Sequence, residues 1–72
     1  MTILHYLVYE KIYRLKDGSE EIDEDIEYIS ECFTKAEAFA RFNDLTASGV
    51  RRIRIDEVRK LPDGKIVNAR IR

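Results

Sequence analysis

The sequence predicts an α+β fold in ββαββ order, with a four-stranded antiparallel sheet and one helix packed on one of its faces. Asp17-Gly18 lies between two apolar-rich segments, which is typical of a tight hairpin. A helical stripe over residues 35–48 begins at a capping pattern, and Pro62 falls in a turn between two further segments of strand composition. We therefore expect the 72 residues to form a single domain, 1–72.

The first hairpin is predicted from residues 3–15 and 20–33, because the first of these segments is rich in β-branched and aromatic types. With Asp17-Gly18 as a two-residue loop, the register separates an apolar face from a largely acidic one, which a one-residue slip would scramble. The apolar face, turned toward the helix, should hold Tyr13–Ile22, Tyr9–Ile26, Leu7–Tyr28 and Ile3–Cys32. The acidic face should hold Arg14–Glu21, Ile12–Asp23, Glu10–Asp25, Val8–Glu27 and Leu4–Glu31.

The helix is predicted over residues 35–48. Thr34-Lys35-Ala36-Glu37 has the capping-box pattern, in which the Thr34 side chain accepts from the Glu37 backbone N–H. Gly49 is expected to end the helix in a left-handed conformation, which glycine adopts without strain. A core-facing stripe follows at helical spacing, made of Ala38, Phe39, Phe42 and Leu45.

The second hairpin is predicted from strands at residues 50–60 and 66–71, joined by the turn at residues 61–65. Ile53 and Ile55 alternate with arginines, whereas Val58 falls out of phase, so we expect a bulge near Asp56-Glu57. One helix cannot cover both faces of a four-stranded sheet. The second face is therefore expected to meet solvent or a partner.

The composition excludes several classes of protein. A single cysteine, Cys32, excludes an internal disulfide and favours a reducing cytoplasm, and no apolar run approaches the roughly 20 residues of a membrane span. The N-terminus lacks the pattern of a signal peptide. The serines have no nucleophile-elbow or phosphate-loop context and His5 is the only histidine, so we expect no enzyme, no cofactor and no metal site.

Acidic residues are concentrated in the first half of the chain, where residues 1–36 carry a charge balance of −5 against +4 for residues 37–72. Alternate positions of an extended strand lie on one side, so the row of carboxylates predicts a surface that docks on a basic protein partner. The alternatives are a solvated strand face and a cation site, although the spacing does not match a calcium-binding loop. The predicted contact residues are Glu21, Asp23, Asp25, Glu27 and Glu31, with Tyr6 beside them.

Basic residues are concentrated in the third predicted strand. Such a patch is able to hold phosphates, and it supports an alternative function as an accessory domain that binds nucleic acid. The competing interpretation is that these are surface charges with cross-strand partners. The residues concerned are Arg51, Arg52, Arg54, Arg59 and Lys60.

In size, element order and charge distribution the whole chain resembles small phage-encoded inhibitors, including anti-CRISPR proteins. No diagnostic motif accompanies the resemblance, so no family residue is transferred to this chain. The resemblance implies an inhibitor that blocks a nucleic-acid path on a host complex. The sequence also leaves open whether the chain is a monomer or a homodimer that associates through the uncovered sheet face or an edge strand.

Overall fold

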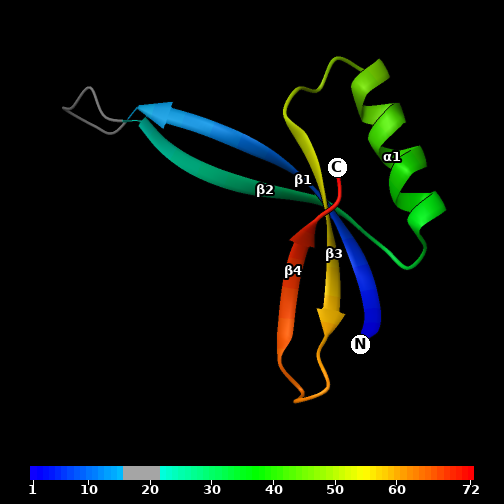
Figure 1. Cartoon of the computed structure of the whole chain (residues 1–72). Helices are drawn as coiled ribbons and strands as arrows, with labels where there is room; N and C mark the ends of the chain where they lie inside the picture. The colour runs from blue at the N-terminus through cyan, green and yellow to red at the C-terminus, as the bar shows by residue number, and fades with distance from the viewer. Residues whose placement is uncertain (16–21) are drawn as a thin grey trace.

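Four antiparallel strands and one helix form the ββαββ fold that the sequence predicts (Figure 1). The computed structural model describes residues 1–15 and 22–72. In one open sheet the strands follow the order β2-β1-β3-β4. The elements are β1 Thr2–Leu15, β2 Ile22–Cys32, α1 Lys35–Ala47, β3 Ile53–Lys60 and β4 Ile66–Arg70.

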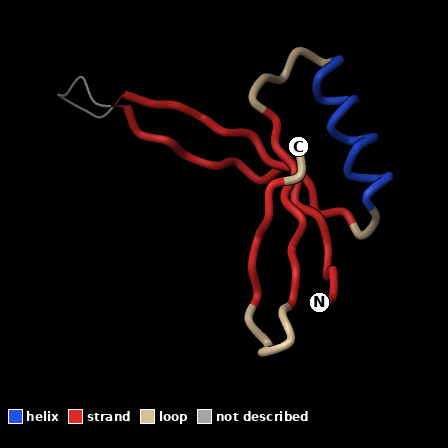
Figure 2. The backbone as a smooth tube through the Cα atoms, viewed as in Figure 1, coloured by secondary structure: helices blue, strands red, loops and turns tan. Residues whose placement is uncertain are grey.

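The sheet has a two-stranded extension. β1 pairs with β2 as far as Leu15, but its pairing with β3 ends at Glu10. The outer parts of the two strands, residues 11–15 and 22–26, therefore form a hairpin arm that reaches away from the helix and from β3–β4 (Figure 1). Figure 2 shows that α1 lies on the other side of the strand bundle from this arm.

The register of the first hairpin differs from the prediction by two residues within the arm. Tyr9 pairs with Tyr28, where Ile26 was expected, and Leu15 pairs with Ile22. A shift of two residues keeps the same residues together on each face, because the side-chain period of a strand is two. The face that carries Tyr9 and Tyr28 nevertheless points away from α1 and not toward it as predicted, since Tyr6 and Val8 of β1 lie in the core under α1. The predicted Asp17-Gly18 loop lies outside the described residues.

A β-bulge near the middle of β2 has a larger effect on the faces. Val8 pairs with Ser30 and Tyr9 with Tyr28, so Ile29 is the extra residue between two consecutive pairs. Beyond the bulge the register has moved by an odd number of residues, so Cys32 lies on the core face, as predicted, together with Tyr6, whereas Tyr28, before the bulge, points away from the helix. Ile29 itself is half-buried against the core.

The predicted core therefore needs correction at the tyrosines. Tyr6, expected on the acidic face, is only 6% exposed and belongs to the core under α1. Tyr28, expected in that core, is 63% exposed, and Ile26 is also exposed. Val8, with no exposed surface, takes the place that the predicted register gave to Leu7.

Both ends of α1 agree with the prediction. Thr34 Oγ1 accepts a hydrogen bond from the Glu37 backbone N–H at 3.1 Å. Gly49 has a φ of +89°, and its N–H donates to the Thr46 carbonyl at 3.1 Å, while the Val50 N–H donates to the Leu45 carbonyl at 3.0 Å. These two bonds form a Schellman motif, which satisfies carbonyls that the last turn would otherwise leave unpaired.

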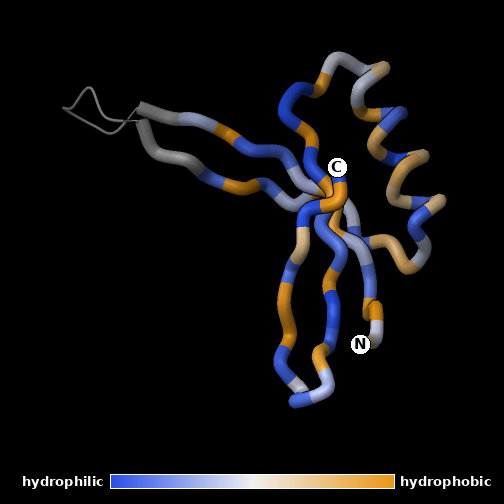
Figure 3. Tube along the Cα trace, in the orientation of Figure 1, coloured by the Kyte–Doolittle hydropathy of each residue, from blue (hydrophilic) through white to orange (hydrophobic). Residues whose placement is uncertain are grey.

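The core lies between α1 and one sheet face. Figure 3 shows hydrophobic and polar segments alternating along α1, as expected for a helix with one buried face. Phe39, Phe42 and Leu45 pack from the helix, as predicted, and the Arg72 guanidinium lies 4.5 Å from the centroid of the Phe42 ring. The buried cluster consists of Tyr6, Val8, Cys32, Ala38, Ile53 and Ile55.

The predicted bulge near Asp56-Glu57 is wrong. β3 keeps an unbroken register with β4 through these two residues, and the irregularity lies on β1 between Ile3 and His5. Val58 is out of phase with Ile53 and Ile55 simply because it is buried on the opposite side of the sheet, where it pairs with His5. Within the described residues, no helix has the length and apolar character needed to cross a membrane.

Candidate functional site

The sheet face opposite α1, called the open face below, is not covered by any described element (Figure 1). Alternation along β1 places Tyr9, Lys11 and Tyr13 on this face, since Tyr6 and Val8 point into the core. Side chains of paired residues share a face, so the register adds residues from the other three strands. They are Ile26, Tyr28 and Glu31 of β2, Arg54 and Asp56 of β3, and Arg70 of β4.

Tyr9 holds the centre of the open face. Its hydroxyl donates a hydrogen bond to Asp56 Oδ1 at 2.9 Å, and its ring meets the Tyr28 ring edge-on with centroids 6.2 Å apart. Burial raises the pKa of Tyr9, and the hydrogen bond to the Asp56 carboxylate raises it further, against smaller opposing effects of Arg70 and Arg54. Tyr9 therefore links β1, β2 and β3 through its side chain.

Arg52 lies where the loop after α1 joins the sheet. Its φ is +58°, a left-handed conformation that is uncommon for a residue with a side chain. Two contacts hold it: the backbone carbonyl accepts from the Lys11 N–H at 3.1 Å, and the guanidinium lies 4.6 Å from the centroid of the Tyr13 ring. These contacts fix one cation beside the arm.

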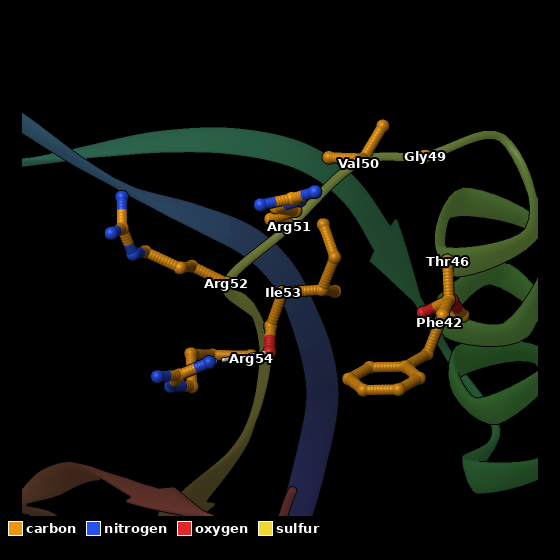
Figure 4. A pocket seen from close by; sticks show the side chains of 8 residues that line it. All are labelled: Phe42, Thr46, Gly49, Val50, Arg51, Arg52, Ile53 and Arg54. Carbon is orange, nitrogen blue, oxygen red and sulfur yellow. Dashed lines mark hydrogen bonds between the residues drawn. The ribbon is translucent and has the colours of Figure 1, made fainter.

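Arg54 sits opposite Tyr9 on the neighbouring strand. Its Nη1 donates to the Ile53 carbonyl at 3.0 Å, whereas its Nε is buried and has no hydrogen-bond partner among the described residues. A buried donor without an acceptor costs about 1–3 kcal/mol. Figure 4 shows the Arg52 and Arg54 side chains on the opposite side of β3 from Phe42.

A pocket of about 420 Å³ adjoins these arginines at the beginning of β3. Phe42 and Thr46 of α1 form one wall, and the loop after the helix forms the other (Figure 4). Arg51, exposed in this loop, lines the pocket together with Arg52 and Arg54. Three of the five predicted phosphate-binding residues are therefore neighbours at the beginning of β3, with the Arg52 and Arg54 side chains pointing away from the Phe42 wall (Figure 4).

The remaining two predicted basic residues lie elsewhere. Arg59 donates through Nε to Glu57 Oε1, and alternation along β3 places this ion pair on the side of the core. Burial and the Glu57 carboxylate both raise the pKa of Tyr6, which faces the pair. Lys60 is exposed at the end of β3. Arg59 is therefore engaged within the fold and does not contribute to the open face.

The predicted acidic surface is reduced by the fold. Asp25 and Glu27 are exposed on the helix side of the hairpin, where Glu27 pairs with Glu10, but Glu31 lies past the bulge on the open face. Glu21 lies outside the described residues, and so does the side chain of Asp23. Tyr6 is buried, so it is not available as a contact residue. Two of the predicted carboxylates, Asp25 and Glu27, thus share one exposed side.

The prediction omitted Lys11 from this surface and assigned Tyr9, Tyr13 and Tyr28 to the core side of the sheet. The sequence did indicate that this face carries cations, because Arg52 and Arg54 alternate with the core residues Ile53 and Ile55 and must point away from the helix. That the tyrosines share this face with the arginines could not be seen without the bulge at Ile29. A register without the bulge assigns Tyr9 and Tyr28 to the helix side.

The described residues contain no group of three or more histidine, cysteine or acidic side chains arranged to hold a metal ion. Comparison of the chain with protein-family models, with curated proteins and with solved structures finds no match. The geometry of the open face, together with the charge distribution, is therefore the basis for the function proposed next.

Proposed function

We propose that the chain is a non-enzymatic binding domain that holds nucleic acid on its open face. The observation that supports this proposal is the gathering of cations and tyrosines on the one sheet face that α1 leaves uncovered. Arginine binds phosphate oxygens through several donors at once, and aromatic rings offer apolar surface to bases. Both are requirements of a nucleic-acid-binding surface.

The charge of the open face favours a polyanion. Lys11, Arg52, Arg54 and Arg70 lie on it with the carboxylates of Asp56 and Glu31, and the hydroxyl of Tyr9 already donates to Asp56. The nearby Arg51 adds a further cation at the pocket. Phosphate binding by such a surface releases counterions and therefore weakens with added salt.

The proposal is tested by fluorescence anisotropy of a labelled oligonucleotide across a salt series. We expect binding at low salt. Arg54→Gln and Arg52→Gln should each reduce the affinity, and each should make the slope of log K against the logarithm of salt concentration shallower by about 0.7–0.9 for each phosphate that the variant no longer neutralises. Lys65→Gln removes the same charge from the exposed turn and serves as the matched control. Absence of binding at micromolar protein and low salt would overturn the proposal.

A second candidate function is supported by the exposed pair Asp25 and Glu27. In this proposal the helix side of the hairpin docks on a basic, nucleic-acid-binding surface of a protein partner and acts as an inhibitor, as the resemblance to anti-CRISPR proteins implies. Glu27→Lys should abolish capture of a host partner, whereas Asp44→Lys on α1, an equal change of charge, should not. Nucleic acid should also compete with the chain for that partner. Capture that changes neither with Glu27→Lys nor with added nucleic acid would contradict this candidate.

A further inference from the structure

We infer that the nucleic acid held on the open face is single-stranded, with one base stacked on Tyr28 and another on Tyr13; the inference rests on the proposed function and specifies its ligand. Tyr28 is 63% exposed and Tyr13 is 39% exposed, and both lie on strands of the hairpin. They are the two most accessible aromatic rings of the open face. An exposed ring is the platform on which an unpaired base stacks.

Each ring is held in place by another side chain of the same face. The edge-on contact with Tyr9 orients Tyr28, and Tyr9 is itself fixed by its hydrogen bond to Asp56. The Arg52 guanidinium lies against the Tyr13 ring. Because these supports restrict the rings before a ligand arrives, stacking a base on them costs less conformational entropy.

The separation of the rings suits two different bases. Tyr28 pairs with Tyr9, and Tyr13 lies four residues further along β1, which corresponds to roughly 13 Å along a strand. One base cannot bridge this distance. A single strand that follows the hairpin is able to place one of its bases on Tyr28 and another, not adjacent in sequence, on Tyr13.

The arginines are placed to take the phosphates of the same strand. Arg54 lies across Tyr9 from Tyr28, two strand spacings or about 10 Å away, and its buried Nε has no acceptor among the described residues. A phosphate oxygen is a strong acceptor for the N–H groups of a guanidinium, and the Arg54 side chain is partly exposed. Stacking and phosphate binding are therefore available to one ligand at once.

A duplex does not fit this arrangement. In a duplex each base face is covered by the next base pair, and only the base edges are accessible in the grooves. The tyrosine rings of the open face would then have nothing to stack on, and binding would depend on the arginines alone. A preference for single strands is thus the property that separates stacking from simple charge attraction.

The test compares three labelled ligands of equal length by fluorescence anisotropy: an oligothymidine, its duplex with oligoadenosine, and an abasic phosphodiester strand. An oligouridine is added to distinguish DNA from RNA, and binding of either single strand supports the inference. We expect the single strand to bind more tightly than the duplex and the abasic strand. Tyr28→Ala should weaken binding of the single strand by about 5- to 150-fold, the loss of one stacked base, and should leave binding of the abasic strand unchanged.

Two variants control this comparison. Tyr28→Phe keeps the ring and should retain the affinity. Phe33→Ala removes a similarly exposed ring that lies between β2 and α1 and should also retain it. Equal binding of all three ligands, or no effect of Tyr28→Ala, would overturn the inference while leaving the proposed function intact. No binding of any ligand would overturn the proposed function itself.

Discussion

The Tyr9 hydroxyl donates to the Asp56 carboxylate across β1 and β3, with 2.9 Å between the two oxygens. The same tyrosine ring contacts Tyr28 of β2, so a single side chain connects three strands of the open face. The bond also engages the carboxylate two residues along β3 from Arg54, whose Nε has no acceptor among the described residues. The contact thus organises the tyrosines and leaves the arginine available to an external anion.

Removal of this bond should cost stability. We expect Tyr9→Phe to lower the free energy of unfolding by about 0.5–1.5 kcal/mol, the net value of a hydrogen bond in a protein. Urea unfolding followed by circular dichroism measures the change. Tyr13→Phe removes a hydroxyl from the exposed ring of the same strand and should change stability by less than about 0.5 kcal/mol. Equal losses in the two variants would show that the Asp56 contact is not stabilising.

Alkaline pH should weaken the fold through Tyr6 and Tyr9. Burial and a neighbouring carboxylate raise the pKa of both phenols above the ordinary value of 10.0. Below that pH both phenols are protonated in the folded and the unfolded chain, and their contribution to the free energy of unfolding is fully present. As the pH rises above it, the unfolded phenols ionise first, so the stability contributed by the protonated phenols is lost until the folded pKa is passed.

This pH dependence is measured by urea unfolding at a series of pH values on either side of 10.0. The wild-type midpoint should fall across the series. The double variant Tyr6→Phe with Tyr9→Phe starts from a lower stability but should lose less of it over the same interval, because its rings do not ionise. Parallel curves for the two proteins would mean that other groups, such as the lysines, cause the decline.

The left-handed conformation of Arg52 gives a prediction about its backbone. Arg52→Gly and Arg52→Ala both remove the guanidinium from the Tyr13 ring, but only glycine adopts a φ of +58° without strain. We therefore expect the glycine variant to be more stable than the alanine variant by about 1 kcal/mol. Thermal or urea unfolding distinguishes them, and equal stability would indicate that the loop relaxes when the side chain is shortened.

The hydrogen bond at the N-terminal cap of α1 should stabilise the fold. Thr34→Ala removes the oxygen that accepts from the Glu37 N–H, and we expect it to lower the free energy of unfolding by about 1 kcal/mol. Thr34→Ser keeps the hydroxyl and should remain within a few tenths of the wild-type value. A loss of the same size in both variants would point to packing of the threonine methyl group instead.

Local patterns of the sequence predicted local structure well. The cap at Thr34 and the left-handed Gly49 depend on residues within one helical turn, and both are present. The element order and the packing of Ile53 and Ile55 under the helix also follow from spacing and alternation. These features involve neighbours in sequence, for which periodicity is a direct guide.

The distribution of residues between the two faces of the hairpin was harder to predict. Ile29 adds one residue to β2 without a glycine or proline nearby to signal it, and alternation counted through that point assigns Tyr6 and Tyr28 to the wrong sides. Arg59 was assigned to a phosphate-binding patch, although it pairs with Glu57. The first error concerns the register of segments distant in sequence, which no single stretch of sequence specifies. The second concerns a partner two residues away on the same side of β3, which alternation along the strand indicated.

β1 belongs to the hairpin arm and to the centre of the sheet, as one strand of 14 residues. A two-stranded hairpin is at best marginally stable in water by itself, so the arm depends for its order on the part of β1 that β3 and α1 hold in place. A peptide cut from the first two strands would not reproduce the surface of the intact chain. Conversely, a ligand that binds Tyr13 stabilises β1, the strand that pairs with both β2 and β3. Binding at the arm should therefore slow the hydrogen exchange of backbone amides in the centre of the sheet.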